Sequence, residues 1–559
     1  MAPELESYKG CDILDINPGV GLWSTKLHER LKPRTHVLVE TLKTPYKPFL
    51  DELVNQPNSR YRFLKLDVNK FRDLNSESIF CEEGLPPGEH LASVDHQVNR
   101  KLLVTGNFSQ YPARATFMGL HTLNRLIALS HAGVRISAYG APKMLMWVAS
   151  EYSNHFVPRA IRNRNNLNLS TDKHGDINLV CCGTNAGAYS AVSRQRQLEE
   201  EVAEKVKERM AAAGIRIPRS CKTESLPDDF VIPRRLIDAE LLTGSEGNKA
   251  HRVKDWDGPD VYMSELGPID FNWPMCNNMI EKFVKAEQLY KEAQKPKSKV
   301  PTEELRRRKL AVSSLRKDTR YVLRARINIG RMVLATEALR DYKTELQKRE
   351  IDWDDADFDE THPEEYKRMK ELSDAVAHLY KRIDTLKHFI EVEALVDDRF
   401  TARRPTPVLA WDRRPYEPLV TNPEDFFPQH ALALVNFTPK EMSKEMYERE
   451  TSRVWWRVVS TLFGSARRNI RTALESITPG ASDYILPLVP ELTDPAQGGM
   501  ADPKDFPVRC LSTEQIEHIV QEWEDSPIRE EGADTLINDT FEDKFATKAK
   551  KKASKRFST

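Results

Sequence analysis

Four polar residues stand at or near the ends of short apolar segments in the first part of the chain: Asp15, Glu40, Asp67 and Asn107. Each segment has the length and the apolar content of a buried strand. If the four strands are parallel, these residues lie along the carboxyl edge of one sheet, where open α/β sheets bind their ligands. The pattern therefore predicts a nucleotide-sized site at this edge, with Glu40 placed to bind ribose hydroxyls.

A glycine turn follows the first of these segments. Asn17 and Pro18 end the apolar run, and Gly19 and Gly21 precede a helical pattern that begins near Trp23. Gly21 lets the backbone approach a ligand closely, and the free amide groups at a helix N-terminus favour a bound phosphate or carboxylate. Ordinary strand–helix connections also contain such turns, so the prediction of a nucleotide site depends on the acidic residues that follow.

The sequence resembles the class I S-adenosylmethionine methyltransferases. More narrowly, it resembles the rRNA adenine N6-dimethyltransferase family and, within it, the fungal mitochondrial transcription factor B branch, the specificity factors of mitochondrial RNA polymerase. The stretches that carry the resemblance are Asp15–Gly21, Leu38–Glu40, Lys65–Val68, Gly106–Phe108, Asp95–Leu102 and Pro142–Val148. The resemblance covers roughly residues 10–190, resumes near Trp411 and runs to about residue 525.

The resemblance implies a fold, a cofactor and partners. The fold would be α/β, with a Rossmann-like class I methyltransferase domain, a long helical insertion and a small C-terminal helical domain. The implied partners are mitochondrial RNA polymerase and promoter DNA or rRNA, and the implied location is the mitochondrial matrix. The residues expected to bind S-adenosyl-L-methionine are Asp15, Asn17, Gly19, Gly21, Glu40, Asp67 and Asn107.

The loop that would hold the target base departs from the family pattern. The dimethyltransferases have Asn-Leu-Pro-Tyr, whereas this chain has Asn107-Phe108-Ser109-Gln110, followed by Tyr111. Gln110 has no aromatic face to stack on an adenine, and such stacking contributes about 1–3 kcal/mol per base. The departure favours a transcription initiation factor that transfers no methyl group.

Two alternatives stay open. The intact acids Glu40 and Asp67 suit an active rRNA adenine N6-dimethyltransferase of the mitochondrial small subunit, in which Asn107 would be the catalytic residue. The second alternative is an inactive scaffold of the mitochondrial ribosome or transcription machinery.

Composition excludes several classes of site. Lys plus Arg and Asp plus Glu each number 84, so the overall charge indicates no nucleic-acid partner, and any such contact must come from local clusters. The seven cysteines include no Cys-x-x-Cys pair, which predicts no metal site. No apolar run reaches the roughly 18–20 residues of a membrane span. The first residues include Glu4 and Glu6 and no Arg-rich amphipathic pattern, so the mitochondrial expectation depends on the resemblance.

The chain divides into five predicted regions. Two long helical patterns, at 302–350 and 363–396, flank the acidic stretch 352–357 and predict a projecting antiparallel hairpin. A docking arm for a partner and a purely structural hairpin are both compatible with this pattern. The regions are a methyltransferase domain at 1–195, an insertion at 196–400, a return to the sheet at 401–440, a helical nucleic-acid-binding domain at 441–525 and a basic disordered tail at 526–559.

Two arginine clusters are candidate nucleic-acid contacts. Arginines meet a phosphate backbone without reading bases, although a solvated surface is the alternative for both clusters. The second cluster is expected on a basic helix, where the first and last of its arginines would share a face. The clusters are Arg159, Arg162 and Arg164, and Arg467, Arg468 and Arg471.

Overall fold

The computed structural model describes most of the chain. The described residues are 2–40, 44–66, 98–109, 116–128, 130–131, 135–137, 140–183, 194–219, 221–223, 273–295, 300–383, 389–427, 429–441 and 449–529. Several predicted features lie outside them: Asp67, Gln110, Tyr111, the segment 224–272 and the basic tail from residue 530.

The centre of the molecule is one eight-stranded sheet with the order β3-β2-β1-β4-β5-β8-β6-β7. Its strands are β1 (Asp12–Ile16), β2 (Thr35–Glu40), β3 (Tyr61–Lys65), β4 (Val98–Asn107), β5 (Ala141–Ala149), β6 (Gly175–Gly183), β7 (Leu419–Thr421) and β8 (Leu432–Pro439). All neighbours pair in parallel except β8, which is antiparallel to both β5 and β6. The mostly parallel α/β sheet is confirmed and is compatible with a Rossmann-like fold.

Alternating side chains of the strands enter two different cores. Leu14 and Val37 join a large cluster on one face, whereas Ile13 and Leu103 join a smaller one with α1 (Ala2–Glu6) and α2 (Leu22–Leu31). Because both faces of β1 and β2 are buried, these strands carry apolar side chains on both faces rather than on one alone. This explains why they were recognisable as short continuous apolar runs.

Further helices and turns complete the region around the sheet. Near β2 and β3 lies α3 (Lys47–Val54), and α8 (Arg196–Ala212) packs beside the short helix α16 (Ala410–Arg413). The others are α5 (Thr116–Ala128), α6 (Ser153–Phe156) and α7 (Asn166–His174).

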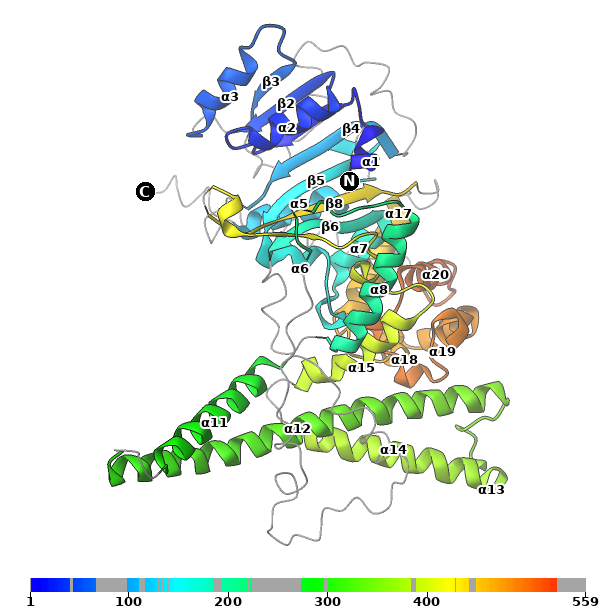
Figure 1. Cartoon of the computed structure of the whole chain (residues 1–559). Helices are drawn as coiled ribbons and strands as arrows, with labels where there is room; N and C mark the ends of the chain where they lie inside the picture. Colours follow the sequence, from blue (N-terminus) through cyan, green and yellow to red (C-terminus); the bar gives the residue numbers. More distant parts are fainter. Residues whose placement is uncertain are drawn as a thin grey trace, which may run out of the picture.

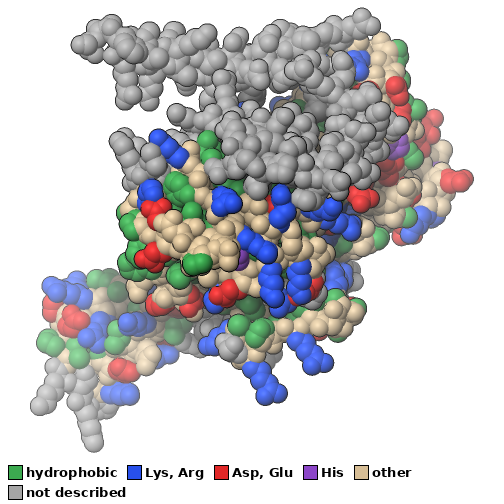
Figure 2. All heavy atoms as spheres, turned by 90° about the horizontal axis from the view of Figure 1, so that it is seen from above, with side chains coloured by type: hydrophobic (Ala, Val, Ile, Leu, Met, Phe, Trp, Pro, Cys, Tyr) green, Lys and Arg blue, Asp and Glu red, His purple; other side chains and the backbone are tan. Residues whose placement is uncertain are grey.

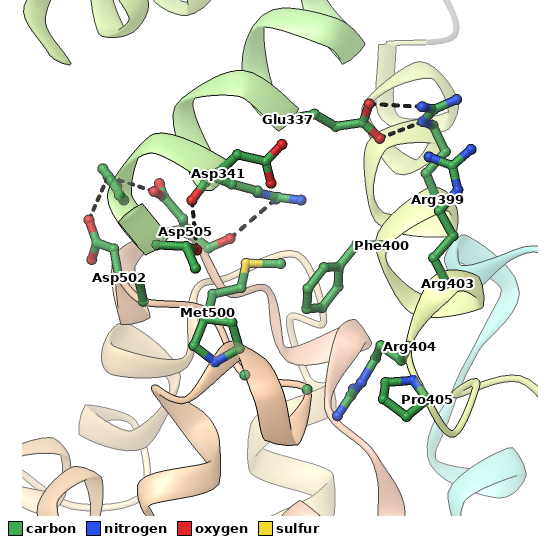
Figure 3. A pocket seen from close by; sticks show the side chains of 17 residues that line it. Glu337, Asp341, Arg399, Phe400, Arg403, Arg404, Pro405, Met500, Asp502 and Asp505 are labelled. Atoms are coloured by element: carbon green, nitrogen blue, oxygen red, sulfur yellow. Dashed lines mark hydrogen bonds and ion pairs between the residues drawn. The ribbon is translucent and has the colours of Figure 1, made fainter. Parts of the chain in front are cut away.

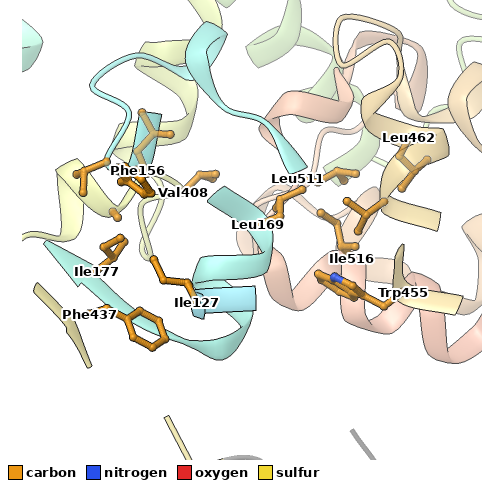
Figure 4. Close-up of a cluster of buried hydrophobic side chains, with 14 of the residues drawn as sticks. Ile127, Phe156, Leu169, Ile177, Val408, Phe437, Trp455, Leu462, Leu511 and Ile516 are labelled. Carbon is orange, nitrogen blue, oxygen red and sulfur yellow. The ribbon is translucent and has the colours of Figure 1, made fainter. Parts of the chain in front are cut away.

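The C-terminal helices share the larger core with the sheet. They are α17 (Arg449–Phe463), α18 (Ile470–Glu475), α19 (Ala481–Leu488) and α20 (Thr513–Glu524). Figure 4 shows Trp455 and Ile516 from this region beside Leu169 of α7, in the same cluster as Phe437 of β8. Ser512 and Gln515 form a reciprocal capping box at the start of α20.

A helical layer lies apart from the sheet, at the bottom of Figure 1. It contains α11 (Pro274–Ala293), α12 (Thr302–Lys348), α13 (Phe358–Thr361), α14 (Pro363–Ile383) and α15 (Phe389–Arg403). The predicted pairing of α12 with α14 is confirmed, and the acidic stretch forms the turn between them. Helix α11 was not predicted from the sequence; it packs along α12 and contributes Phe283 to their shared core.

Candidate cofactor and nucleic-acid site

The glycine turn has the backbone geometry that its sequence predicted. Gly19 and Gly21 have φ angles of 62° and 81°, in the left-handed region that glycine adopts without strain. A Cβ atom on Gly21 would lie 2.8 Å from the Cδ1 atom of Leu53. Asn17 also has a positive φ, of 53°, which asparagine tolerates better than most residues. The turn therefore leads from β1 into α2 with little room for larger side chains at position 21.

The ends of β1 and β4 are held together at the carboxyl edge. The Nδ2 group of Asn17 donates a hydrogen bond to the carbonyl oxygen of Asn107 over 3.1 Å. Ile16 pairs with Gly106, where an added Cβ would lie 2.8 Å from the Ile16 carbonyl oxygen. The glycine at position 106 is thus what lets these two strands approach closely, and the predicted site residues Asn17 and Asn107 meet.

Glu40 ends β2 at the same edge and is buried. Val39 pairs with Ile16, so the register places Glu40 beside Asn17. The backbone carbonyl of Glu40 accepts a hydrogen bond from the amide of Leu66, which extends β3 toward the position of Asp67. Glu40 therefore stands at the carboxyl edge beside the glycine turn, and its binding of a cofactor stays a prediction.

Asp15 does not lie open to this edge. Its side chain is buried, and its Oδ2 atom accepts a 2.5 Å hydrogen bond from the Ser24 hydroxyl of α2. The Nε2 atom of His36 lies 3.4 Å from the same oxygen. The prediction that Asp15 contacts a cofactor directly is wrong in this structure, because the carboxylate fastens α2 against β1 and β2 instead.

Asn107 has its side-chain oxygen engaged. The Oδ1 atom accepts hydrogen bonds from the Ser109 amide, at 3.0 Å, and from the Ser109 hydroxyl, at 2.6 Å. These two bonds use both lone pairs of the amide oxygen. The neighbouring Phe108 is buried and its amide donates to the carbonyl of Trp147. Asn107 is therefore arranged as part of a turn, with no acceptor capacity left on Oδ1 for a substrate amine.

A row of aromatic residues lies beside Asn107, and sequence reasoning missed its arrangement. The Trp23 indole donates a 2.9 Å hydrogen bond to Thr105 and meets the Trp147 ring edge-to-face at 5.4 Å. Trp147 in turn pairs with Asn107 across the sheet and meets Phe426 at 5.6 Å. Only the position of Trp23 directly after the glycine turn hinted at this arrangement.

The first arginine cluster does not form an exposed patch. The guanidinium of Arg159 lies 4.2 Å from the centre of the Trp411 ring, and Arg162 is half-buried. Arg164 is buried and donates to the carbonyl oxygens of Arg509 and Leu511. Burial lowers the pKa of Arg164 to about 10. The prediction that Arg164 binds nucleic acid is wrong, because its guanidinium anchors the segment that precedes α20.

The second arginine cluster is exposed, but it is not on one helix. Helix α17 ends at Phe463 and α18 begins only at Ile470, so Arg467 and Arg468 lie in the turn between these two helices. The expected shared helical face is therefore wrong. Arg467 pairs with Glu393 at 2.7 Å, and Arg471 pairs with Asp483 at 3.1 Å. The Arg471–Asp483 pair is exposed on both sides and contributes only about 0–1 kcal/mol, so a phosphate can replace Asp483, whereas Glu393 is half-buried.

Basic side chains gather elsewhere on the described surface too. Figure 2 shows Lys and Arg side chains close together over the middle and lower part of one face, although the whole chain has no net charge. Local clusters of this kind are sufficient to attract a polyanion within a Debye length of about 10 Å.

A cavity of about 360 Å³ lies away from the glycine turn, between α12, α15 and the loops after α19. Figure 3 shows Phe400 at its centre, with Arg404 on one side and Met500 on another. Most of its charged groups are paired, as in the contact of Arg399 with Glu337. The cavity therefore lies where the helical layer meets the C-terminal region, and its lining includes none of the residues predicted to bind the cofactor.

Among the described residues, no group of His, Cys, Asp and Glu side chains is arranged to hold a metal ion. None of the helices in the described part of the chain is long and apolar enough to cross a membrane.

Comparison with protein-family models and with curated proteins finds no match for this chain.

Proposed function

We propose that this protein is a mitochondrial transcription initiation factor, a nucleic-acid-binding protein with a methyltransferase-type fold that assists mitochondrial RNA polymerase and transfers no methyl group. The observation that carries the proposal is the engaged Oδ1 atom of Asn107, which accepts both available hydrogen bonds from Ser109. A methyltransferase of the resembled family would need that oxygen to orient the target amine. The sequence resemblance supplies the polymerase and the mitochondrial location.

The α/β architecture supports the proposal that the fold derives from a methyltransferase. The sheet is mostly parallel, and one of its edges carries both the glycine turn into α2 and the acid at the end of β2. This is the edge at which open α/β sheets bind nucleotides and similar ligands. A bound S-adenosylmethionine would have Gly19, Gly21 and Glu40 as its neighbours, whether or not it reacts.

The second candidate is an rRNA adenine N6-dimethyltransferase. The placement of Glu40 beside the turn favours it, because this acid ends β2 at the edge where open α/β sheets bind nucleotides. Rotation of Ser109 away from Asn107 would be required before catalysis.

One set of assays distinguishes the candidates. We expect the purified protein to stimulate promoter-dependent transcription by mitochondrial RNA polymerase and to transfer no methyl group to a small-subunit rRNA hairpin. Calorimetric titration with S-adenosylmethionine then reports whether the pocket still binds. Methyl transfer to the hairpin would overturn the proposal in favour of the second candidate, and the absence of both activities would favour a scaffold.

Gly21→Ala should weaken S-adenosylmethionine binding by about tenfold or more, since the added methyl group strains a left-handed position at the cofactor edge and meets Leu53. The matched control is Gly10→Ala, because Gly10 has a similar φ of 75° but lies before β1, at the opposite end of that strand. Both variants should lose about 1 kcal/mol of stability. Equal calorimetric affinities for the two variants would count against a cofactor at this turn.

Replacing Arg467 and Arg471 together with Ala should lower nucleic-acid affinity and flatten its dependence on salt, because each lost phosphate contact reduces the slope of log K against log salt by about 0.9 on duplex DNA. Fluorescence anisotropy with promoter DNA at several salt concentrations measures this slope. An unchanged slope would contradict a phosphate contact by either arginine and leave their contacts within the chain, such as those with Glu393 and Asp483, as their role.

A further inference from the structure

The first half of α12 is strongly basic. Between residues 305 and 331 the sequence contains ten Lys or Arg residues and a single acid, Asp318. The rest of the chain balances this excess, so the positive charge is a local property of this helix rather than of the protein. A uniform cationic segment of this length on a regular helix presents a positive field to anything anionic that approaches.

One face of this segment is committed to the packing with α11. Val312, Thr319 and Val322 are buried at three- and seven-residue spacing, and Val312 and Val322 belong to the core shared with α11 and α14. The same face carries Arg308, which pairs with Glu304 at 3.0 Å. This face therefore explains why the segment is a stable helix, but it does not use the remaining cations.

The opposite face is a continuous exposed stripe, which we call the α12 stripe. It contains Arg306, Leu310, Ser313, Lys317 and Tyr321, all exposed. Leu310 and Tyr321 are 63% and 61% exposed, which is unusual for large hydrophobic residues on a helix whose other face is well packed. At a rise of 1.5 Å per residue the stripe extends over about 22 Å.

The cations of the α12 stripe have no acidic partner within the described chain. Arg306 and Lys317, and Lys309 beside them, form no ion pair with any described residue, whereas Arg307 and Arg316 lie near Glu303 and Glu287. Such an array requires counterions from solution, and their release on binding a polyanion is the main source of nonspecific affinity for nucleic acids.

We infer that the α12 stripe binds a single-stranded polynucleotide. The phosphates would lie against Arg306, Lys309 and Lys317, and the ring of Tyr321 offers a flat face on which an unpaired base can stack. Positive charge interleaved with an exposed aromatic ring is the combination that binds single strands without sequence preference. The inference does not rest on the proposed function, because a single-strand contact on α12 requires neither a cofactor nor a polymerase.

The test compares two triple variants of the full chain, with oligouridylate of about 20 nucleotides as the probe and no S-adenosylmethionine present. The stripe variant is Arg306→Gln, Lys309→Gln and Lys317→Gln. The matched control makes the same change of charge elsewhere on the hairpin, at Lys348, Lys367 and Lys381, which are all exposed. Circular dichroism checks that both variants keep the helix content of the parent protein.

We expect the stripe variant to lose about tenfold in affinity and about 2 in the slope of log K against log salt, since each phosphate contact on a single strand contributes about 0.7. The control should keep both values, and Tyr321→Ala alone should lower affinity about tenfold with the slope unchanged. Equal losses in the stripe variant and the control would overturn the inference. The inference would also be overturned, in favour of an acidic protein partner, if the stripe variant lost more affinity for poly-glutamate than for oligouridylate.

The outcome is separable from that of the proposed function. Suppose that the stripe variant binds RNA as the parent does, while replacing Arg467 and Arg471 abolishes promoter binding. This result would contradict the α12 contact and leave the proposed initiation factor supported. The reverse pattern would keep the α12 contact and remove the proposed promoter contact.

Discussion

Replacing Arg194 with Ala should lower the free energy of unfolding by about 3–5 kcal/mol, because the substitution leaves two buried carboxylates without their cation. The Nη1 and Nη2 atoms of Arg194 donate to both carboxylate oxygens of Asp412, at 2.7 and 3.3 Å. Asp398 lies 3.8 Å from the Nε atom of Arg194. All three side chains are buried, and they connect the start of α8 to α15 and α16.

Chemical denaturation followed by circular dichroism measures this loss. The control is Arg196→Ala, two residues away, which removes a partly exposed i,i+4 pair with Glu200 and leaves the Asp398 and Asp412 network intact, so its loss should be well below 1 kcal/mol. The deficit of the Arg194 variant should also shrink as the pH falls. Burial already raises the pKa of Asp412, and without Arg194 this carboxyl becomes neutral more readily. A deficit equal to that of the control would show that the network contributes little.

The second large effect is a loss of stability in mild acid that depends on His174. Burial, together with the neighbouring His131, lowers the pKa of His174 to about 3. The two rings are stacked with their centres 5.4 Å apart, and the Nδ1–H group of His174 donates to the Ser170 carbonyl. An unfolded chain would take up the proton near the ordinary histidine pKa of about 6.5.

The two pKa values of His174, in the folded and the unfolded chain, decide whether acid stabilises or destabilises the fold. Between about pH 6.5 and pH 3 the unfolded chain binds one proton more at this site, so acid favours unfolding. At pH 5 the loss from this residue is about 2 kcal/mol relative to pH 7.5. His28, whose ring stacks on that of His36, acts in the same direction, since burial lowers the pKa of His28 to about 4. Asp398 opposes it, because burial raises its pKa to about 6.

His174→Gln isolates this contribution from the others. The variant should be less stable than the parent at pH 7.5 because packing is lost, but its further loss between pH 7.5 and pH 5 should be smaller by about 2 kcal/mol. His430→Gln, at an exposed position, serves as the control and should keep the parent pH dependence. Identical pH profiles for the parent and the His174 variant would contradict the assignment.

The elements of the fold were largely predictable because their signals are local. Short apolar runs between turn residues identified β1, β2 and β4. The glycine turn was also predictable, since glycine adopts a positive φ such as that of Gly21 without strain. A sustained helical period identified α12 and α14 and the turn that joins them.

The environments of the site residues were decided by the tertiary structure. Asp15 has the residue type of a ligand, yet Ser24 and His36 reach it from α2 and β2 and occupy it. Arg164 has the residue type of a phosphate contact, yet its partners are carbonyl groups 345 and 347 positions away in the chain. Sequence by itself determined where strands, helices and turns occur, because those depend on neighbouring residues. Only the folded chain decided which polar groups are buried and paired, because their partners come from segments that no local pattern connects.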